Sequence, residues 1–111
     1  MSELAKTPNP PFYAVIFTSV RRQADEQAYQ ETAARMLRLA ARQTGFLGVD
    51  SAHSDGVGIT VSYWESEKAI RTWKLQVEHS EAQRRGRENW YRQYSLRVAR
   101  VERAYDFQAS T

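Results

Sequence analysis

Residues 58–74, GITVSYWESEKAIRTWK, place two tryptophans, Trp64 and Trp73, nine positions apart in a chain of 111 residues. Indole rings at this density either fill a hydrophobic core or line an apolar pocket in which chemistry takes place. His79 lies six residues beyond Trp73. An imidazole titrates near pH 6.5 and can act as a general base. Six residues correspond to about 600° of helical rotation, so Trp73 and His79 would occupy different faces of one helix.

Metal, phosphate and disulfide sites have little support in the sequence. The chain has no cysteine, which excludes disulfides and thiolate metal ligands. His53 and His79 are 26 residues apart and form no HxH or HExxH pattern. Gly56 and Gly58 are not followed by a phosphate-binding loop, and a turn explains them. We therefore predict no metal and no cofactor, and we interpret His53 as a surface residue.

Positive charge is concentrated near the C-terminus. The formal net charge is +3, and seven arginines fall between residues 84 and 103: Arg84, Arg85, Arg87, Arg92, Arg97, Arg100 and Arg103. Such a cluster either binds a phosphate backbone or forms a solvated face. An RNA-recognition motif would carry a basic–glycine–aromatic phrase on its third strand. GITVSYW has none, so we predict no nucleic-acid partner.

The elements that position these side chains begin with a strand and a helix. Residues 12–20, FYAVIFTSV, are mostly β-branched and aromatic, which is typical of a strand. Both faces of this strand are largely apolar, so something should cover each of them. Asp25 is placed to cap a helix that ends near Gln43, and Gly45 suits the left-handed position after it.

A hairpin is predicted next. Residues 47–53 and 57–64 read as strands, and the turn Ser54, Asp55 and Gly56 between them contains the Asp-Gly pair that favours a tight turn. Trp64 then ends the third strand, near the mouth of any cavity. Ser66 caps a second helix, expected to continue to Arg85. The buried stripe of this helix is predicted to consist of Ile70, Trp73 and Val77.

A short helical piece is expected at 87–92, and a long last strand at 94–107. The apolar residues of this strand change parity partway: Leu96 and Val98 share one face, and Val101, Tyr105 and Phe107 share the other. A β-bulge or a change of partner would produce such a switch.

The element order is therefore βαββαβ, in one domain at 12–107, with a flexible leader at 1–11 and a tail at 108–111. Two helices on one face of a sheet leave the other face bare, although the first strand is apolar on both sides. A second copy is the economical cover, so we predict a homodimer through the sheet faces. The sequence carries no signal-peptide pattern and no apolar run of about 20 residues, so we predict a cytoplasmic protein without membrane association.

The element order and two phrases, GFLGVDS at 45–51 and ITVSYWESEKAIRTWK at 59–74, resemble the antibiotic biosynthesis monooxygenase domains. The resemblance covers about residues 12–107, and the tail from Ala82 to Phe107 resembles an uncharacterised subgroup. It implies an α+β fold: a ferredoxin-like domain with an antiparallel sheet that pairs into a dimeric α+β barrel.

The resemblance also separates two kinds of reaction. In haem-degrading members, a tryptophan at the place of Trp73 presses against the porphyrin, with an asparagine on the first strand and a histidine ten residues past the tryptophan. Here the first strand offers Thr18 and Ser19, and the tenth residue is Gln83. Haem degradation is therefore disfavoured.

Cofactor-independent members deprotonate an electron-rich aromatic substrate, which then passes electron density to oxygen. For this reaction His79 is the candidate catalytic base, because it is the only histidine in the predicted helical region; the alternative is a solvated histidine on the helix. The candidate substrate-binding residues are Tyr63, Trp64, Trp73, Arg87, Trp90 and Tyr91. Two hypotheses remain open: a cofactor-independent monooxygenase acting on a small aromatic or apolar substrate, and a non-catalytic dimeric module for small-molecule binding or stress response.

Overall fold

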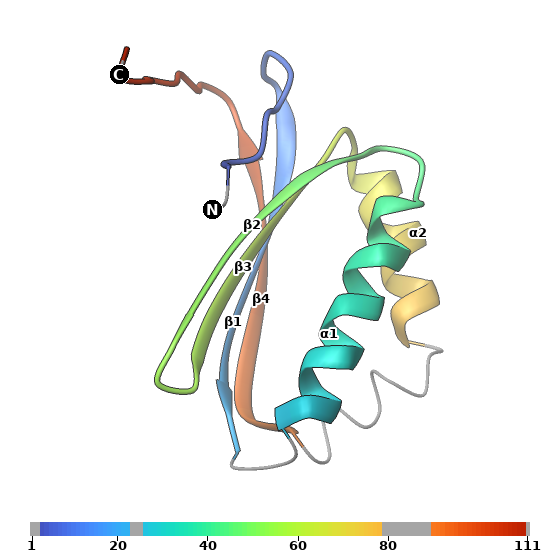
Figure 1. Ribbon diagram of the computed structural model, residues 1–111. Helices are drawn as coiled ribbons and strands as arrows, with labels where there is room; N and C mark the ends of the chain where they lie inside the picture. The colour runs from blue at the N-terminus through green and yellow to red at the C-terminus, as the bar shows by residue number, and fades with distance from the viewer. Residues whose placement is uncertain (1–2, 23–25, 79–89, 111) are drawn as a thin grey trace.

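The computed structural model describes residues 3–22, 26–78 and 90–110. The elements are β1 (Phe12–Arg21), α1 (Glu26–Ala41), β2 (Phe46–Ser54), β3 (Val57–Trp64), α2 (Glu67–Glu78) and β4 (Tyr91–Val101). The four strands form one antiparallel sheet in the order β2-β3-β1-β4, and both helices lie on one side of it (Figure 1). The predicted βαββαβ order and ferredoxin-like α+β fold are confirmed. Neither described helix combines the length and the apolar character needed to cross a bilayer.

The two sides of the sheet follow from the alternation along β1. Tyr13 and Val15 belong to the cluster that also contains Ala40 of α1 and Ile70 of α2. Odd-numbered β1 residues and their cross-strand partners therefore face the helices, and we call this the helix-facing side. Even-numbered β1 residues, such as Ile16, face the other way, onto what we call the helix-free side.

Local signals in the sequence fix the turns and caps. The Ser66 hydroxyl accepts a hydrogen bond from the Ala69 backbone N–H at 3.1 Å, so it caps α2 as predicted. Gly45 has a φ of 92°, which confirms the left-handed position after α1. Asp55 and Gly56 have φ values of 52° and 80°, the pair of positive values that a type I′ hairpin turn requires.

The last strand differs from the prediction at both ends. β4 begins at Tyr91, so the helical piece expected over 87–92 is wrong for residues 91–92. It ends at Val101, which pairs with Phe12, the first residue of β1. Pro10 and Pro11 precede Phe12 and lack the backbone N–H that would continue the ladder. Residues 102–107 therefore find no strand to pair with.

The irregularity in the pairing of β4 with β1 is not at the position predicted from the sequence. Pairing with β1 is continuous from Gln93 to Val101, and the register shifts only where Arg21 pairs with Tyr91. The bulge or change of partner expected partway along the strand is therefore wrong for residues 93–101, and the shift at the start of β4 is a separate feature. In α2, the predicted stripe is confirmed, since Ile70 and Val77 are buried and Trp73 packs on the core. The expected extension from residue 79 to Arg85 lies outside the described residues.

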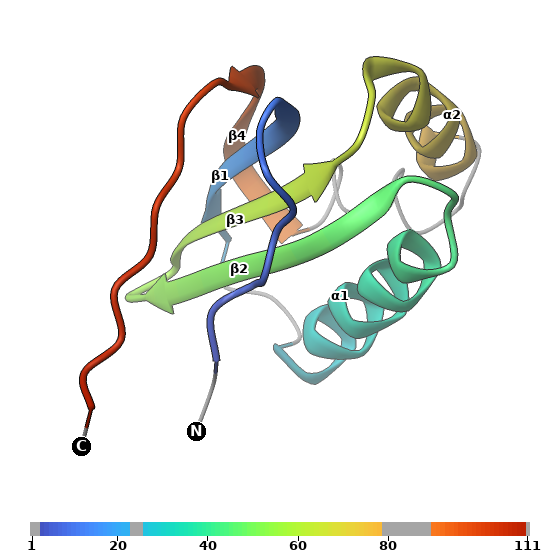
Figure 2. The same ribbon diagram turned by 90° about the horizontal axis from the view of Figure 1, so that it is seen from above.

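The N-terminal segment runs across the helix-free side (Figure 2). The Ala5 backbone N–H donates a hydrogen bond to Asp50 Oδ1 on β2 at 2.8 Å. A Cβ built on Gly48 would lie 3.1 Å from the Ala5 Cβ, so a glycine on β2 lets the segment approach. Part of the helix-free side is therefore covered by the chain itself.

Candidate functional site

Trp64 is the centre of the hydrophobic core. Its side chain has 0% exposure, and its Nε1 donates a buried hydrogen bond to the Ser62 hydroxyl at 2.9 Å. Phe46 of β2 meets it edge-on, with ring centroids 5.4 Å apart and planes at 81°. The expected position at a cavity mouth is wrong, because both helices close over the end of β3.

Trp73 packs on Trp64 from α2. The two ring centroids lie 5.1 Å apart with planes at 34°, and we call these two residues the tryptophan pair. The Trp73 side chain is half-buried. Its Nε1 is shielded from water, yet it finds no acceptor among the described residues. Buried indole N–H groups are usually hydrogen-bonded, and this one lacks the usual partner within the described part of the chain.

The helix-facing side continues beyond the tryptophan pair along β1 and β4. Val15, in the core cluster with Trp64, pairs with Val98 of β4. Further along, Leu96 pairs with Phe17, and Tyr94 pairs with Ser19. Directly opposite residues share a face of the sheet. We call Tyr94, Leu96 and Val98 the β4 apolar stripe.

The β4 apolar stripe is open to solvent. Tyr94, Leu96 and Val98 are 37%, 42% and 47% exposed, although they lie on the same side of the sheet as the helices. The helices make their main contacts with β2 and β3, at the other half of the sheet. An uncovered apolar strip beside the tryptophan pair is the kind of surface on which an apolar ligand rests.

An aromatic cluster borders the stripe at the start of β4. Phe17 lies 5.3 Å from Tyr94 and 5.6 Å from Tyr91, measured between ring centroids. Tyr91 and Tyr94 meet edge-on at 5.6 Å. The Arg22 backbone N–H donates to the Trp90 carbonyl at 2.7 Å, and Arg22 Nε donates to the Tyr91 carbonyl at 3.2 Å. These bonds tie the start of β4 to the end of β1.

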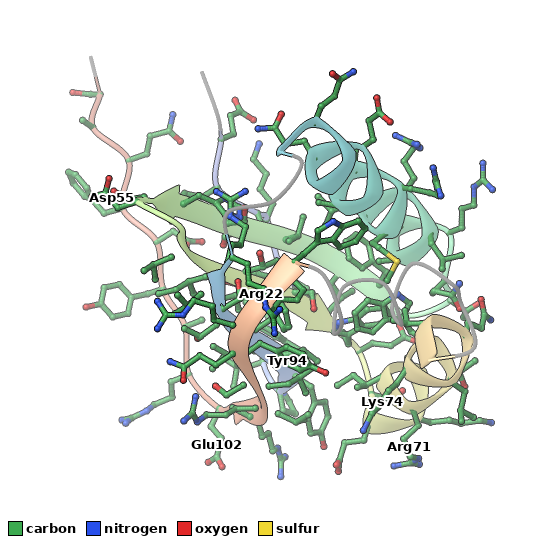
Figure 3. The ribbon with its side chains drawn as sticks, turned by 90° about the horizontal axis from the view of Figure 1, so that it is seen from below. Arg22, Asp55, Arg71, Lys74, Tyr94 and Glu102 are labelled. Carbon is green, nitrogen blue, oxygen red and sulfur yellow. The ribbon has the colours of Figure 1, made fainter. Side chains whose placement is uncertain are left out.

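Charged side chains of α2 lie at the surface. Arg71 and Lys74 are exposed on α2, and Figure 3 shows them apart from Tyr94, which comes from β4. The tryptophan pair and the β4 apolar stripe are therefore apolar apart from the tyrosine hydroxyl and the indole N–H. Such a surface suits a ring system with one or two oxygen atoms. In the described part of the chain, no group of three or more histidine, aspartate or glutamate side chains is placed to hold a metal.

Tyr63 does not join this surface. It pairs with Ala14, so it lies on the helix-free side, opposite to its neighbour Trp64. Its hydroxyl donates a hydrogen bond to Asp50 Oδ2 at 2.9 Å, and Phe12 meets its ring edge-on at 6.0 Å. Burial, the hydrogen bond to Asp50 and the negative charge of Asp50 raise the pKa of Tyr63 to about 12. Tyr63 and the tryptophan pair therefore lie on opposite sides of the sheet, so they cannot line one surface of this chain.

The remaining candidates fall into two groups. His79 and Arg87 lie outside the described residues. Trp90 is buried, at 8% exposure, and Tyr91 is half-buried in the aromatic cluster. His53 is exposed, as predicted, with its ring across Gly58: a Cβ built on Gly58 would lie 2.7 Å from His53 Cδ2.

Sequence reasoning missed the contribution of β1 and β4. Phe17, Tyr94, Leu96 and Val98 were not among the candidate ligand-binding residues. Their shared side depends on the β1–β4 register, which pairs two strands separated by most of the chain. The signal in the sequence was the common parity of Leu96 and Val98, and it could not say which side they faced.

Two sequence comparisons identify relatives of the chain, one over residues 11–85 and one over its full length. Residues 11–85 match the model of the family described as antibiotic biosynthesis monooxygenase. The chain is also 54% identical over 112 residues to the uncharacterised protein YqjZ of Bacillus subtilis strain 168. That match covers 100% of this chain and 97% of YqjZ.

Solved structures with the same fold have low sequence identity. SnoaB, a cofactor-independent oxygenase from Streptomyces nogalater, superposes with a TM-score of 0.64 at 14% identity, covering 90% of this chain and 100% of SnoaB. Protein NE2512 of Nitrosomonas europaea, whose function is unknown, superposes with a TM-score of 0.68 at 11% identity, covering 93% and 100% of the two chains. At these identities the structural similarity establishes the fold alone.

Proposed function

The chain belongs to the antibiotic biosynthesis monooxygenase family, and from that premise we propose that it is a cofactor-independent monooxygenase of small electron-rich aromatic compounds. The ligand would lie on the helix-facing side, against Trp73 and the β4 apolar stripe. SnoaB, which shares the fold, is a cofactor-independent oxygenase, and this supports the choice of reaction class.

The reaction needs few protein groups. A base removes a proton from an activated methylene or phenol, and the resulting anion passes electrons to oxygen. With an anthrone-type methylene, one oxygen atom replaces the two hydrogens as a carbonyl and the other leaves as water. The substrate supplies all four electrons, so no reductant is required. The protein must exclude water and stabilise the anion.

One observation carries the proposal: the Trp73 Nε1–H is buried and has no acceptor among the described residues. A hydrogen-bond donor held in an apolar surrounding stabilises a developing oxyanion more strongly than the same donor in water. The Trp64 ring behind Trp73 fixes the position of this donor. Its neighbour Trp64 has no such capacity, because its N–H is already bonded to Ser62.

We propose His79 as the base that removes the substrate proton. It is one of two histidines in the chain, and His53 is exposed on β2. A neutral imidazole at neutral pH is suited to this step. The second histidine gives a matched control for any substitution of the first.

The proposed assembly is a homodimer through the helix-free side. Val57 and Ile59 on this side are 43% and 46% exposed. Ile16 and Val61, which pair with each other across β1 and β3, are half-buried beside them. Burying this apolar area against a second copy would contribute roughly 25 cal/mol for each Å² removed from water. A two-fold axis would let the same surface serve both chains.

Oxygen uptake with a panel of anthrones and quinols tests the reaction. With ¹⁸O₂, the wild-type protein should place one labelled atom in the product. His79→Ala should lower the turnover rate at least about 100-fold, as expected for loss of a general base, and His53→Ala should leave it unchanged. Saturable binding of these compounds without any uptake would favour the non-catalytic binding module instead.

A further inference from the structure

A cation lies at the end of the sheet where β4 begins. Arg22 follows the last residue of β1, and its side chain is exposed. Its backbone N–H donates to the Trp90 carbonyl at 2.7 Å, and its Nε donates to the Tyr91 carbonyl at 3.2 Å. Two consecutive carbonyls therefore hold the backbone and the guanidinium of one residue, so this side chain has a defined position although it lies at the surface.

Arg22 adjoins the aromatic cluster at the end of the β4 apolar stripe. The Tyr91 ring lies 5.6 Å from Phe17 and 5.6 Å from Tyr94, measured between centroids. The carbonyl of the same Tyr91 accepts the bond from Arg22 Nε. Figure 3, seen from this end of the sheet, shows Arg22 next to Tyr94, in agreement with these contacts. A ligand that rests on the stripe and extends past Tyr94 would therefore meet the guanidinium.

The Arg22 guanidinium retains most of its hydrogen-bond donors. Its five N–H groups form a planar fork, and Nε uses one of them on the Tyr91 carbonyl. Within residues 3–22, 26–78 and 90–110, no acceptor or carboxylate is bonded to the two Nη groups. The edge formed by both Nη groups can donate to the two oxygens of one carboxylate at the same time. The geometry thus leaves open the edge that suits an organic acid.

The charges of the two strands favour an anionic ligand. β1, Arg22 and β4 contain no aspartate and no glutamate, but five arginines: Arg21, Arg22, Arg92, Arg97 and Arg100. Arg21 pairs with Tyr91, and Arg92 follows Tyr91 directly, so both belong to the same end of the sheet as Arg22. A surface that carries charge of one sign attracts a ligand of the opposite sign.

We propose that Arg22 binds a carboxylate of the ligand, and that the preferred ligands are fused aromatic acids whose rings rest on the β4 apolar stripe. The inference rests on the ligand surface proposed above and names its class of substrate. Val15, in the core cluster with the tryptophan pair, and Ser19, opposite Tyr94, are four residues apart on β1, which is about 13 Å at the rise of a strand. A single benzene ring does not span this length, whereas a fused polycyclic acid does.

The position of Arg22 makes it a specificity-determining residue. Trp73, at the other end of the stripe, would contact the oxygen that becomes negative during the reaction, and Arg22 would contact a group that does not react. An interaction made equally in the ground state and the transition state lowers KM and leaves kcat unchanged. Loss of the Arg22 side chain should therefore raise KM for an anthrone carboxylate about 10-fold and change kcat less than about twofold.

Isothermal titration calorimetry at low ionic strength, where charge pairs are least screened, tests the contact without turnover. The probes are two matched pairs: anthraquinone-2-carboxylate with its neutral carboxamide, and the corresponding naphthalene compounds. The wild type should bind each acid about 10-fold more tightly than its amide. Arg22→Gln should lose this preference and keep the affinity for the amide, which also shows that the variant is folded. Arg71→Gln, an exposed arginine on α2, should keep the preference.

The outcomes separate this inference from the proposed function. Equal affinity of the wild type for acid and amide, or a preference that survives in Arg22→Gln, overturns the role of Arg22 alone. An Arg22→Gln variant that lowers kcat without raising KM overturns it as well. No binding of either pair to the wild type overturns the ligand surface and the inference with it. Selective binding of the acids without oxygen uptake supports Arg22 and contradicts only the reaction.

Discussion

Trp64 and Trp73 pack against each other with ring centroids 5.1 Å apart, yet their two N–H groups are in different states. The Trp64 N–H is bonded to Ser62 inside the core, and the Trp73 N–H has no acceptor among the described residues. The first tryptophan is therefore fully committed to the fold. The second retains one unused polar group at the edge of the core, and the proposed reaction depends on it.

Trp64→Ala should destabilise the protein by about 3–5 kcal/mol, because it removes the largest fully buried side chain and leaves a cavity. The Ser62 hydroxyl would also lose its partner. Urea unfolding followed by circular dichroism measures the change. Leu75→Ala, on the exposed surface of α2, should stay within about 0.5 kcal/mol of wild type. A similar loss in both variants would contradict the assignment of Trp64 to the core.

Gly45→Ala should cost more stability than Gly56→Ala, although both glycines have a positive φ. At Gly56 a Cβ meets nothing within 4 Å, so only the backbone penalty of about 1–2 kcal/mol applies. At Gly45 a Cβ would lie 2.7 Å from the Ala69 Cβ, so α2 would have to move and the total should reach about 3 kcal/mol. Equal costs, measured by thermal or urea unfolding, would show that α2 does not press on Gly45.

The Tyr63–Asp50 pair predicts a loss of stability at high pH. The pKa of Tyr63 is about 12 when folded and about 10 when unfolded, so both states are protonated below pH 10 and the stabilising contribution is then complete. As the pH rises from about 10 towards 12 the unfolded chain loses its proton first, and stability falls. Tyr63→Phe should remove this fall in stability between pH 10 and 12, and Asp50→Asn should make it smaller. The midpoint of urea unfolding, measured between pH 9 and 11, tests this prediction. If the stability of Tyr63→Phe fell with pH as steeply as that of the wild type, the loss could not be assigned to Tyr63.

Ile59→Glu should dissociate the proposed dimer, because it places a charge among the exposed apolar side chains of the helix-free side. Leu75→Glu adds the same charge to an exposed position on α2 and should leave the association unchanged. Analytical ultracentrifugation at micromolar concentration measures the association of both variants. A dimer that survives Ile59→Glu would place the interface on another surface.

Local patterns predicted the elements well because their causes are local. The strand limits at 57–64, the Ser66 cap and the left-handed Gly45 each depend on neighbouring residues. The end of β4 depends instead on where its partner strand begins, and that is set by Pro10 and Pro11 at the opposite end of the chain. No residue within the stretch 94–107 therefore indicates that β4 ends at Val101.

The candidate site was harder to predict for a similar reason. Tyr63 and Trp64 are adjacent in sequence, and strand alternation sends them to opposite sides of the sheet. Conversely, Phe17 and Tyr94 are far apart in sequence and meet at 5.3 Å through the β1–β4 pairing. Aromatic residue types indicated a ligand-binding surface, but only the register shows which rings share it.

Oxygen uptake by Trp73→Phe, compared with the wild type and with Leu75→Ala, tests the central claim most directly. Phenylalanine keeps an aromatic ring at position 73 and removes the N–H that has no acceptor among the described residues. If that N–H stabilises the substrate anion, kcat should fall about 100-fold or more with little change in urea stability, as for the loss of one oxyanion donor. Leu75→Ala, at an exposed position on α2, should retain turnover. Full turnover by Trp73→Phe, or no uptake by the wild type with any compound of the panel, would contradict the account.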